Sequence, residues 1–264
     1  MTKRSYLTTL KRFLQEFWFI PSDALIRSYE SEIWKRMRFP NPNLTIGCGD
    51  GRYDRMLFNE EGFDYAIDIS KKDFILAKNS GFYTNVELAD ATKMPFKNNF
   101  FAAVIANSTI EHIKNDKKAI EEASRVLKKG GMFYFTTTTD LLEKELLTVL
   151  GSKENFEIFN TRMNHFHYRS FREWKEILEV CGLKVIKHSY YMNSKTLNIW
   201  YRLFKLFTNK FNNRELWSYL KDSKYSRYIP GKLIGMIEYM IVRKNVSVNE
   251  NESGVWQYIA AQKI

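Results

Sequence analysis

The sequence has few of the residues that mark disulfide-rich or cysteine-bound metal domains. Its 264 residues include two cysteines, five prolines and four histidines. Cys48 and Cys181 fall in separate predicted elements, and their spacing fits neither a disulfide framework nor a cysteine-based metal site. Because a chain with so little cysteine suits a reducing compartment, we expect a cytoplasmic protein.

Long apolar runs are also missing. No segment reaches the roughly 18 uninterrupted apolar residues that a membrane-spanning helix needs. The apolar run from Phe13 to Ile20 follows basic residues, as in a signal peptide, but Gln15 and Glu16 interrupt it and no small-residue cleavage site follows. The sequence therefore predicts neither a spanning helix nor a cleaved leader.

Glycine is sparse overall, yet three glycines stand at alternate positions after a short apolar run. Gly47, Gly49 and Gly51 follow Leu44-Thr45-Ile46, which has the character of a strand. Glycine lets a backbone turn tightly and approach a ligand without a Cβ in the way. The next stretch, 52 to 59, is expected to be helical, so its free N–H groups would face the loop. The pattern favours a nucleotide-type cofactor loop over a plain turn.

A second apolar run ends in Asp68, about 20 residues after the glycines. At this spacing in a nucleotide-binding βαβ unit, a carboxylate binds the ribose hydroxyls. Further strands and helices then alternate along the chain, which predicts a doubly wound parallel sheet. The expected elements are a helix over 71–79, a strand over 86–91 that carries Asp90, a strand over 101–106, a helix over 116–127 closed by residues 128–131, and a strand over 132–138.

Five ordered motifs carry a resemblance to a known family. They are Ile-Gly-Cys-Gly-Asp-Gly, Ala-Ile-Asp-Ile-Ser, Ala-Asp-Ala-x-x-Met-Pro-Phe, Asn-Ser-x-Ile-Glu-His-Ile and Arg-Val-Leu-Lys-Lys-Gly-Gly. In this order they resemble the class I, Rossmann-like S-adenosylmethionine-dependent methyltransferases, in particular their type 11 small-molecule group. The resemblance covers residues 43–138, with a weaker echo over 170–191 and 254–262. It implies a mostly parallel seven-stranded sheet that ends in an antiparallel strand pair. Dinucleotide oxidoreductases share only the first two motifs.

The resemblance implies S-adenosyl-L-methionine as cofactor and assigns residues to it. Gly47, Cys48, Gly49 and Gly51 would wrap its methionine part, Asp68 with the adjacent Ile69 its ribose, Asp90 and Ala91 its adenine, and Asn107 or Ser108 would lie beneath the sulfonium. Thr45 and Ala102 stand where the family usually has acids. The hold on the methionine ammonium is therefore expected to be weaker or to run through water.

Candidate catalytic residues cluster in a polar stretch over 160–170, which precedes a helix that Ser170 can cap. An extended segment there would place His165 and His167 on one face, and one imidazole could accept a hydroxyl proton. His112, in Ile-Glu-His-Ile, is the second candidate base. A structural role is the alternative for each histidine. Two histidines without further ligands at a recognisable spacing do not predict a metal site.

Charge and length indicate additions around the cofactor domain. We expect an N-terminal helical cap over 1–42, a Rossmann-like domain over 43–191 with 254–264, and a helical insertion over 192–253 that forms a substrate cap or a dimer surface. The cap should contain two helices divided at Pro21, the second capped by Ser22 or Asp23 and ended by Pro40. Residues 1–42 carry eight basic and four acidic side chains, 43–140 thirteen and fourteen, and 141–264 twenty and twelve.

Because the excess of basic residues lies outside the cofactor module, we expect a small polar, anionic acceptor that carries phosphate. A merely solvated lysine surface is the alternative. The concrete hypothesis is O-methylation of a sugar or nucleotide-linked sugar for a surface polysaccharide. An RNA methyltransferase is the first alternative, disfavoured because no Asn-Pro-Pro-Tyr element and no RNA-binding module are present. The second is a non-catalytic regulatory protein that binds the cofactor. Aromatic and basic residues in the insertion would also suit peripheral membrane contact, and the chain could be a monomer or a homodimer.

Overall fold

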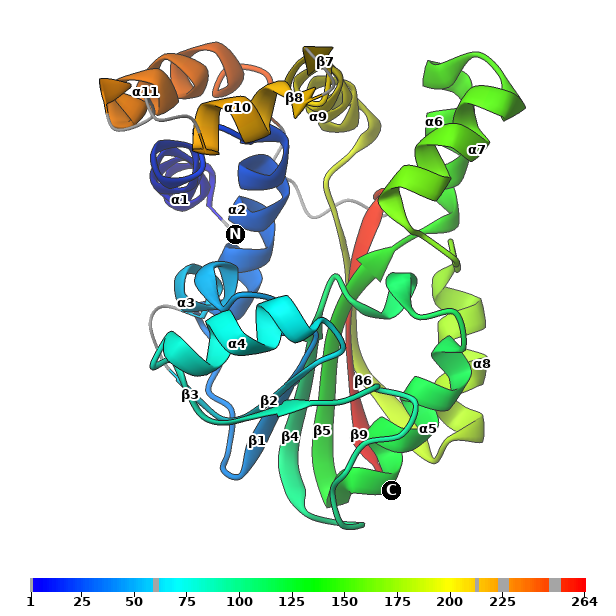
Figure 1. Ribbon diagram of the computed structural model, residues 1–264. Coiled ribbons are helices and arrows are strands. Elements are labelled where there is room, and N and C mark those ends of the chain that lie inside the picture. The colour runs from blue at the N-terminus through cyan, green and yellow to red at the C-terminus, as the bar shows by residue number, and fades with distance from the viewer. Residues whose placement is uncertain (1, 59–61, 212–213, 223–227, 247–252) are drawn as a thin grey trace. The chain divides into compact units, whose positions relative to one another are not determined.

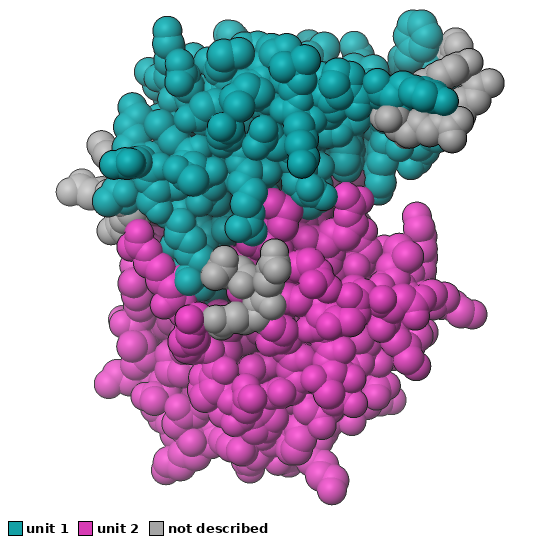
Figure 2. All heavy atoms as spheres, turned by 90° about the vertical axis from the view of Figure 1, so that its left-hand side faces the viewer, with its two compact units in different colours: residues 1–35, 192–250 teal, residues 36–191, 251–264 magenta. Residues whose placement is uncertain are grey.

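The computed structural model describes residues 2–58, 62–211, 214–222, 228–246 and 253–264. The chain divides into two compact units, which Figure 2 shows in different colours. Residues 1–35 and 192–250 make up one, called here the helical unit, and residues 36–191 and 251–264 make up the other, called the sheet unit. The N-terminal segment and the insertion, expected as separate additions, thus belong to the same unit.

The sheet unit contains one seven-stranded sheet in the order β3-β2-β1-β4-β5-β9-β6 (Figure 1). The strands β1 to β5 pair in parallel with one another, and β9 runs antiparallel to both β5 and β6. The predicted seven-stranded, mostly parallel sheet is confirmed. Its strands are β1 (Asn43–Ile46), β2 (Phe63–Asp68), β3 (Tyr83–Leu88), β4 (Phe101–Asn107), β5 (Leu127–Thr138), β6 (Leu183–Tyr191) and β9 (Trp256–Lys263).

Two strand boundaries differ from the prediction. β5 begins at Leu127, so residues 128–131, expected to close a helix, are part of the strand. Leu127 pairs with Phe101, and the pairing of β4 with β5 shifts register between Phe101 and Ala103. This irregularity in the pairing accommodates residues 128–131 within the strand, where the sequence predicts the end of a helix. β3 ends at Leu88, so Asp90 lies in the loop beyond the strand.

Helices pack on both faces of the sheet. On one face, α5 (Asp116–Val126) and α8 (Phe171–Val180) bury Ala123 and Trp174 against Val104 and Phe133. On the other side lie α3 (Arg52–Leu57) and α4 (Lys71–Asn79), as Figure 1 shows. The range of α4 is as predicted. The expected end of the preceding helix at residue 59 falls outside the described residues. This layering leaves the carboxyl ends of the parallel strands at one edge, where α/β proteins bind ligands.

The segment between β5 and α8 is more helical than expected. It forms α6 (Asp140–Leu150) and α7 (Lys153–Met163), and α7 ends at Asn164, which has a left-handed φ of 55°. Residues 160–163, expected to belong to the polar stretch before α8, are therefore the last turn of a helix, and that stretch begins only at Asn164. Ser170 caps α8 as predicted, and Glu173 completes a capping box.

The helical unit is built from α1 (Lys3–Glu16), α2 (Pro21–Trp34), α9 (Ser194–Phe207), α10 (Leu216–Asp222) and α11 (Gly231–Val242), with the short strands β7 (Lys210–Phe211) and β8 (Arg214–Glu215). α1 contacts α2 and α11, and α2 contacts α9. Gly235 allows the close approach of α11, because a Cβ there would collide with the backbone of Leu14. Within the described residues, no helix combines the length and apolar character needed to cross a bilayer.

The prediction for the caps of α2 was wrong. Ile20 occupies the N-cap position and makes no side-chain cap, while Pro21 opens the helix with its fixed φ. Ser22 and Asp23 therefore fall in the first turn. The helix also ends at Trp34, several residues before Pro40, so Pro40 does not end it.

Candidate functional site

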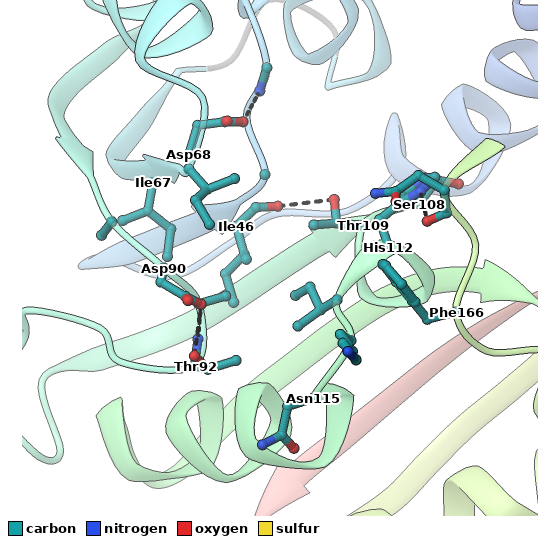
Figure 3. Close-up of a pocket in the computed structure, with 18 residues that line it drawn as sticks. Ile46, Ile67, Asp68, Asp90, Thr92, Ser108, Thr109, His112, Asn115 and Phe166 are labelled. Carbon is teal, nitrogen blue, oxygen red and sulfur yellow. Dashed lines mark hydrogen bonds between the residues drawn. The ribbon is translucent and has the colours of Figure 1, made fainter. Parts of the chain in front are cut away.

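A cavity of about 560 Å³ opens at the carboxyl ends of β1, β2 and β4. This volume lies within the usual range of small-molecule sites. The residues that line it all belong to the sheet unit. In Figure 3, Ile67, Asp68 and Asp90 stand on one side, and Ser108, His112 and Phe166 stand on the other. The cavity thus has one wall from β2 and the loops after β2 and β3, and a second wall from the segment after β4 and the loop after α7.

The glycine loop takes the backbone shape that the sequence predicts. Gly47 and Gly49 have φ values of 72° and 53°, which favour glycine. A Cβ on Gly47 would collide with the side chain of Thr109, whereas a Cβ on Gly49 would meet nothing within 4 Å. Since Gly49 lines the cavity, the open space before it is space that a ligand can fill.

Asp68 both faces the cavity and holds this loop. Its Oδ2 accepts a hydrogen bond from the Gly49 N–H at 2.8 Å, and its Oδ1 accepts one from the Ser70 N–H at 2.8 Å. Each oxygen keeps further acceptor capacity toward the cavity. The carboxylate can therefore receive the two hydroxyls of a ribose while it fixes the loop beside them.

The surroundings of Asp68 and Asp90 suit an adenosine group. Asp90 is exposed, and its Oδ1 accepts hydrogen bonds from the Thr92 N–H and Oγ1, both at 2.8 Å. Next to Asp68 in the sequence, the lining residue Ile69 has an apolar side chain that is 73% exposed. A flat purine ring would cover this apolar surface and present its amine to a carboxylate. The lining residues therefore fit a ligand with a ribose and an adenine.

Seven of the ten predicted cofactor residues line the cavity and three do not. Those that line it are Gly47, Gly49, Asp68, Ile69, Asp90, Ala91 and Ser108. The Cys48 thiol is buried, and this burial, together with Asp54, raises its pKa. Gly51 packs against the ring of Tyr83, and Asn107 accepts a hydrogen bond from Thr136. These three residues lie outside the lining set of the cavity.

A carboxylate lies beside the position where the family motif has lost one. Thr45 donates a hydrogen bond to Asp54 Oδ2 at 3.4 Å, and Tyr83 donates one to the same oxygen at 2.8 Å. Asp54 belongs to α3 and is buried. A buried carboxyl group therefore lies next to Thr45, although it comes from a different element.

The second wall contains a cluster of Glu111, His112 and His165, called here the polar cluster. One ligand-type atom from each side chain lies within 4.8 Å of the others, and the two imidazole centroids are 4.7 Å apart. Glu111 and His112 belong to the 3-10 helix η1 (Ile110–His112) after β4. Phe166 donates a backbone hydrogen bond to the Glu111 carbonyl at 2.9 Å, which ties the extended loop to this helix.

The predicted alternation along the extended loop is present, but its phase is reversed. Asn164 and Phe166 line the cavity, and the two histidines between and after them do not. His165 is buried against His112. His167 donates from Nε2 to the Lys114 carbonyl at 3.0 Å and accepts from Arg169, which pairs with Asp116. His167 therefore anchors the loop to the start of α5 and is not brought into the cavity. The sequence alone could not predict which of these side chains face the cavity, because the end of helix α7 determines where the extended stretch begins.

Burial makes His165 a neutral imidazole. Its pKa falls to about 3, first because the ring is desolvated and second because His112 lies beside it. A kinetic ionisation near the ordinary histidine range would therefore not belong to His165. Of the three histidines proposed from the sequence, His112 alone lines the cavity.

Sequence reasoning missed several residues of the cavity. Thr109 braces the glycine loop by donating to the Ile46 carbonyl at 3.3 Å, as Figure 3 shows. Lys114 is the lysine of the lining set. The remaining missed residues include Thr92, Asn115, Asn164 and Phe166. Thr92 and Thr109 occupy variable positions inside recognised motifs. Their position shortly after a predicted strand was the sequence signal that could have identified them as cavity residues.

Comparisons with known proteins agree with this geometry. A family model described as a methyltransferase domain matches residues 44–135. An uncharacterised protein of Methanocaldococcus jannaschii is 34% identical over 186 residues, which cover 69% of this chain and 83% of that protein. A malonyl-[acyl-carrier protein] O-methyltransferase of Buchnera aphidicola is 32% identical, over 36% of this chain and 38% of that enzyme. A tRNA (carboxymethyluridine(34)-5-O)-methyltransferase of Arabidopsis thaliana is 34% identical, over 35% of this chain and 23% of that enzyme.

Among solved structures, a methyltransferase of Thermotoga maritima described as a possible histamine N-methyltransferase gives a TM-score of 0.58 at 16% identity. It covers 97% of this chain, and the chain covers 100% of it. At this identity the likeness concerns the fold. The chain spans most of the archaeal relative but less than half of the two relatives with named acceptors, and those acceptors differ. The acceptor therefore has to be inferred from the site itself.

Proposed function

The chain belongs to the class I S-adenosylmethionine-dependent methyltransferases, and from this premise we propose that it methylates an oxygen atom of a small, anionic acceptor. The proposed acceptor class is a sugar or nucleotide-linked sugar used in surface-glycan biosynthesis. The observation that carries the oxygen acceptor is the polar cluster in the cavity wall, where His112 reaches the lining next to a buried carboxylate and a second imidazole.

The cofactor assignments follow from the lining residues. Asp68 would bind the ribose diol, Asp90 with Ala91 the adenine, and Gly47 and Gly49 the methionine part. S-adenosylmethionine supplies a methyl group on a positively charged sulfur. Ser108 belongs to the opposite wall, as Figure 3 shows, and is the proposed floor beneath that sulfur. The protein then has to align an acceptor atom with the methyl carbon for an in-line displacement.

An oxygen acceptor adds one requirement that an amine lacks. A hydroxyl must lose its proton as the new bond to carbon forms, and a positioned group within reach speeds that loss. The polar cluster offers such help at the wall of the cavity. A neutral amine needs none, and a cavity for an amine would not require a buried carboxylate beside two imidazoles.

Charge supports an anionic acceptor. Lys114 is among the lining residues, beside the acids Asp68 and Asp90, which are proposed to serve the cofactor. The helical unit adds a strong basic excess, with 17 basic and eight acidic residues in its sequence. Both observations favour a negatively charged group such as phosphate on the acceptor.

The same basic excess is compatible with RNA, and one relative is named as a tRNA methyltransferase. The absence of an Asn-Pro-Pro-Tyr element after β4 and of an RNA-binding module in the sequence makes this the second candidate. A regulatory protein that binds the cofactor without transfer is the third.

The test is transfer from labelled S-adenosylmethionine into three samples: a nucleotide-sugar extract, total RNA and buffer alone. We expect label in a small, anionic product whose fragmentation places the methyl group on oxygen. Label in RNA, or on nitrogen, would overturn the proposal. Cofactor binding by calorimetry without transfer into any sample would favour the regulatory alternative. Asp68→Ala protein serves as the control for cofactor-dependent labelling.

A further inference from the structure

We propose that Glu111, His112 and His165 bind a divalent transition-metal ion at the wall of the cofactor cavity. The proposal deepens the proposed function, because it states how this site would help an acceptor hydroxyl lose its proton. It starts from the spatial arrangement, in which one oxygen and two nitrogen ligand atoms lie within 4.8 Å of one another. Two atoms bound to one zinc ion at about 2.1 Å each lie at most about 4.2 Å apart, so a small side-chain rotation brings atoms at the 4.8 Å limit onto a shared ion.

The hydrogen bonds of both imidazoles fix the nitrogen that can act as a ligand. His112 Nδ1 lies 3.1 Å from the Asn164 carbonyl, which can only accept, so Nδ1 carries the proton. His165 Nδ1 lies 3.2 Å from the Tyr168 hydroxyl, which gives its own proton to Asn160 at 2.9 Å. In each ring the lone pair therefore resides on Nε2.

This pattern is typical of metal-binding histidines. A histidine ligand usually donates its second ring N–H to a carbonyl, carboxylate or other fixed acceptor, which sets the tautomer and the ring orientation. Here the acceptors are themselves fixed. Asn164 ends α7, and Tyr168 is held by Asn160 of the same helix. Two different segments thus deliver two oriented imidazoles to one place.

Burial and chemistry limit the ion class. Glu111 is 1% exposed and His165 is 7% exposed, while His112 reaches the cavity lining. Two imidazoles and one carboxylate suit Zn²⁺, Mn²⁺ or Fe²⁺, whereas Mg²⁺ and Ca²⁺ prefer oxygen ligands alone. Three protein ligands leave coordination positions open, and the position of His112 directs them toward the cavity.

The chemical consequence concerns the acceptor. A divalent cation lowers the pKa of a hydroxyl that reaches it, so that the proton passes to solvent. The acceptor oxygen then forms its bond to the methyl carbon, and the carbon–sulfur bond breaks with its electron pair going to sulfur. The products are a methyl ether, S-adenosylhomocysteine and one proton, and no oxidant or reductant is needed.

The direct test is metal binding by untagged protein that has been dialysed against a chelator. Titration with Mn²⁺, followed by electron paramagnetic resonance, and with Zn²⁺, followed by calorimetry, should show one ion per chain and a rise in melting temperature. Glu111→Gln and His165→Ala should each weaken binding at least tenfold. Tyr168→Phe keeps all three ligands and should weaken it about 10-fold, because it removes the acceptor that orients His165.

His167→Gln is the matched control, since His167 lies in the same loop but outside the polar cluster, and its metal affinity should equal that of the unmodified protein. Melting curves without metal show whether each variant is folded. The absence of saturable binding, or binding retained in both Glu111→Gln and His165→Ala, would overturn the proposal.

Failure of the proposed function can be distinguished from failure of the metal proposal. O-methyl transfer that survives the chelator rejects the metal and retains the oxygen acceptor, whereas metal binding with transfer to nitrogen retains the metal and rejects the oxygen acceptor.

Discussion

The two units of the chain differ in how they use charged residues. The sheet unit is nearly balanced, with 24 basic and 22 acidic residues, and its acids include Asp68 and Asp90 at the cavity. The helical unit has 17 basic and eight acidic residues. In the sheet unit the residues proposed to hold the cofactor follow strands and belong to motifs. The basic residues of the helical unit belong to no recognisable motif, so experiments are needed to find what they bind.

Exposed apolar residues occur in both units, but their placement differs. In the sheet unit a core of apolar side chains packs between sheet and helices, and the exposed ones are scattered over several elements. In the helical unit, α11 exposes Leu233, Ile237, Met240 and Ile241, each between 46% and 66%, while Gly235 and Glu238 are buried. These exposed positions recur at helical spacing and form one stripe. A substrate cap, a dimer surface and membrane contact all remain predictions for this unit.

The largest expected effect comes from the acid that the sheet unit places at the end of β2. Asp68→Ala removes an acceptor of charge-assisted hydrogen bonds, each worth about 1.5–3 kcal/mol, so calorimetry should show S-adenosylmethionine binding weakened at least tenfold. Glu87→Ala is the control, because Glu87 is exposed on β3 and does not line the cavity. Equal affinity in Asp68→Ala and Glu87→Ala would remove the ribose assignment.

A second prediction compares two glycines in one loop. Gly47→Ala and Gly49→Ala both place a Cβ at a positive φ, at a cost of about 1–2 kcal/mol each. Only Gly47→Ala also collides with Thr109, so its free energy of unfolding should fall by a further 1–3 kcal/mol or so. Denaturant unfolding measures both values. A Thr109→Ala background should shrink the difference, and a difference that stays unchanged would show that Thr109 is not the cause.

How much of this the sequence could predict depends on whether a position is fixed locally. The glycine loop, Asp68 and the Ser170 cap were predictable because each depends on residues a few positions away. The phase of His165 and His167 was not, since it depends on where α7 ends at Asn164. The approach of His165 to Glu111 and His112 joins segments about 50 residues apart, and no local pattern encodes it.

A third prediction concerns a buried acid of the helical unit. Burial raises the pKa of Glu238 to about 8, so the folded protein holds a proton there that the unfolded chain releases near pH 4.5. Between these values the folded state binds more protons, and stability should fall as pH rises, by up to about 1.4 kcal/mol per pH unit. Glu238→Gln, which stays neutral, should flatten the dependence of unfolding free energy between pH 5 and 8. An unchanged slope would mean that Glu238 is ionised in the folded protein.

The smallest expected effect is a salt dependence of the Michaelis constant, and it shows which unit binds the charged group of the acceptor. If lysines bind a phosphate-bearing acceptor, its Michaelis constant should rise a few-fold between low and 0.3 M salt, because exposed charges are screened within roughly 10 Å at 0.1 M. The Michaelis constant of S-adenosylmethionine should change little, because hydrogen bonds to partly enclosed groups depend less on screening.

Lys114→Gln tests the cavity lining, and Lys205→Gln on α9 tests the exposed basic surface of the helical unit. Loss of salt sensitivity in Lys114→Gln alone assigns recognition to the sheet unit, and loss in Lys205→Gln extends it to the helical unit. Equal salt sensitivity for both substrates in the unmodified protein would leave the basic excess as a solvated surface, and the comparison of the two units would then concern solubility and not acceptor recognition.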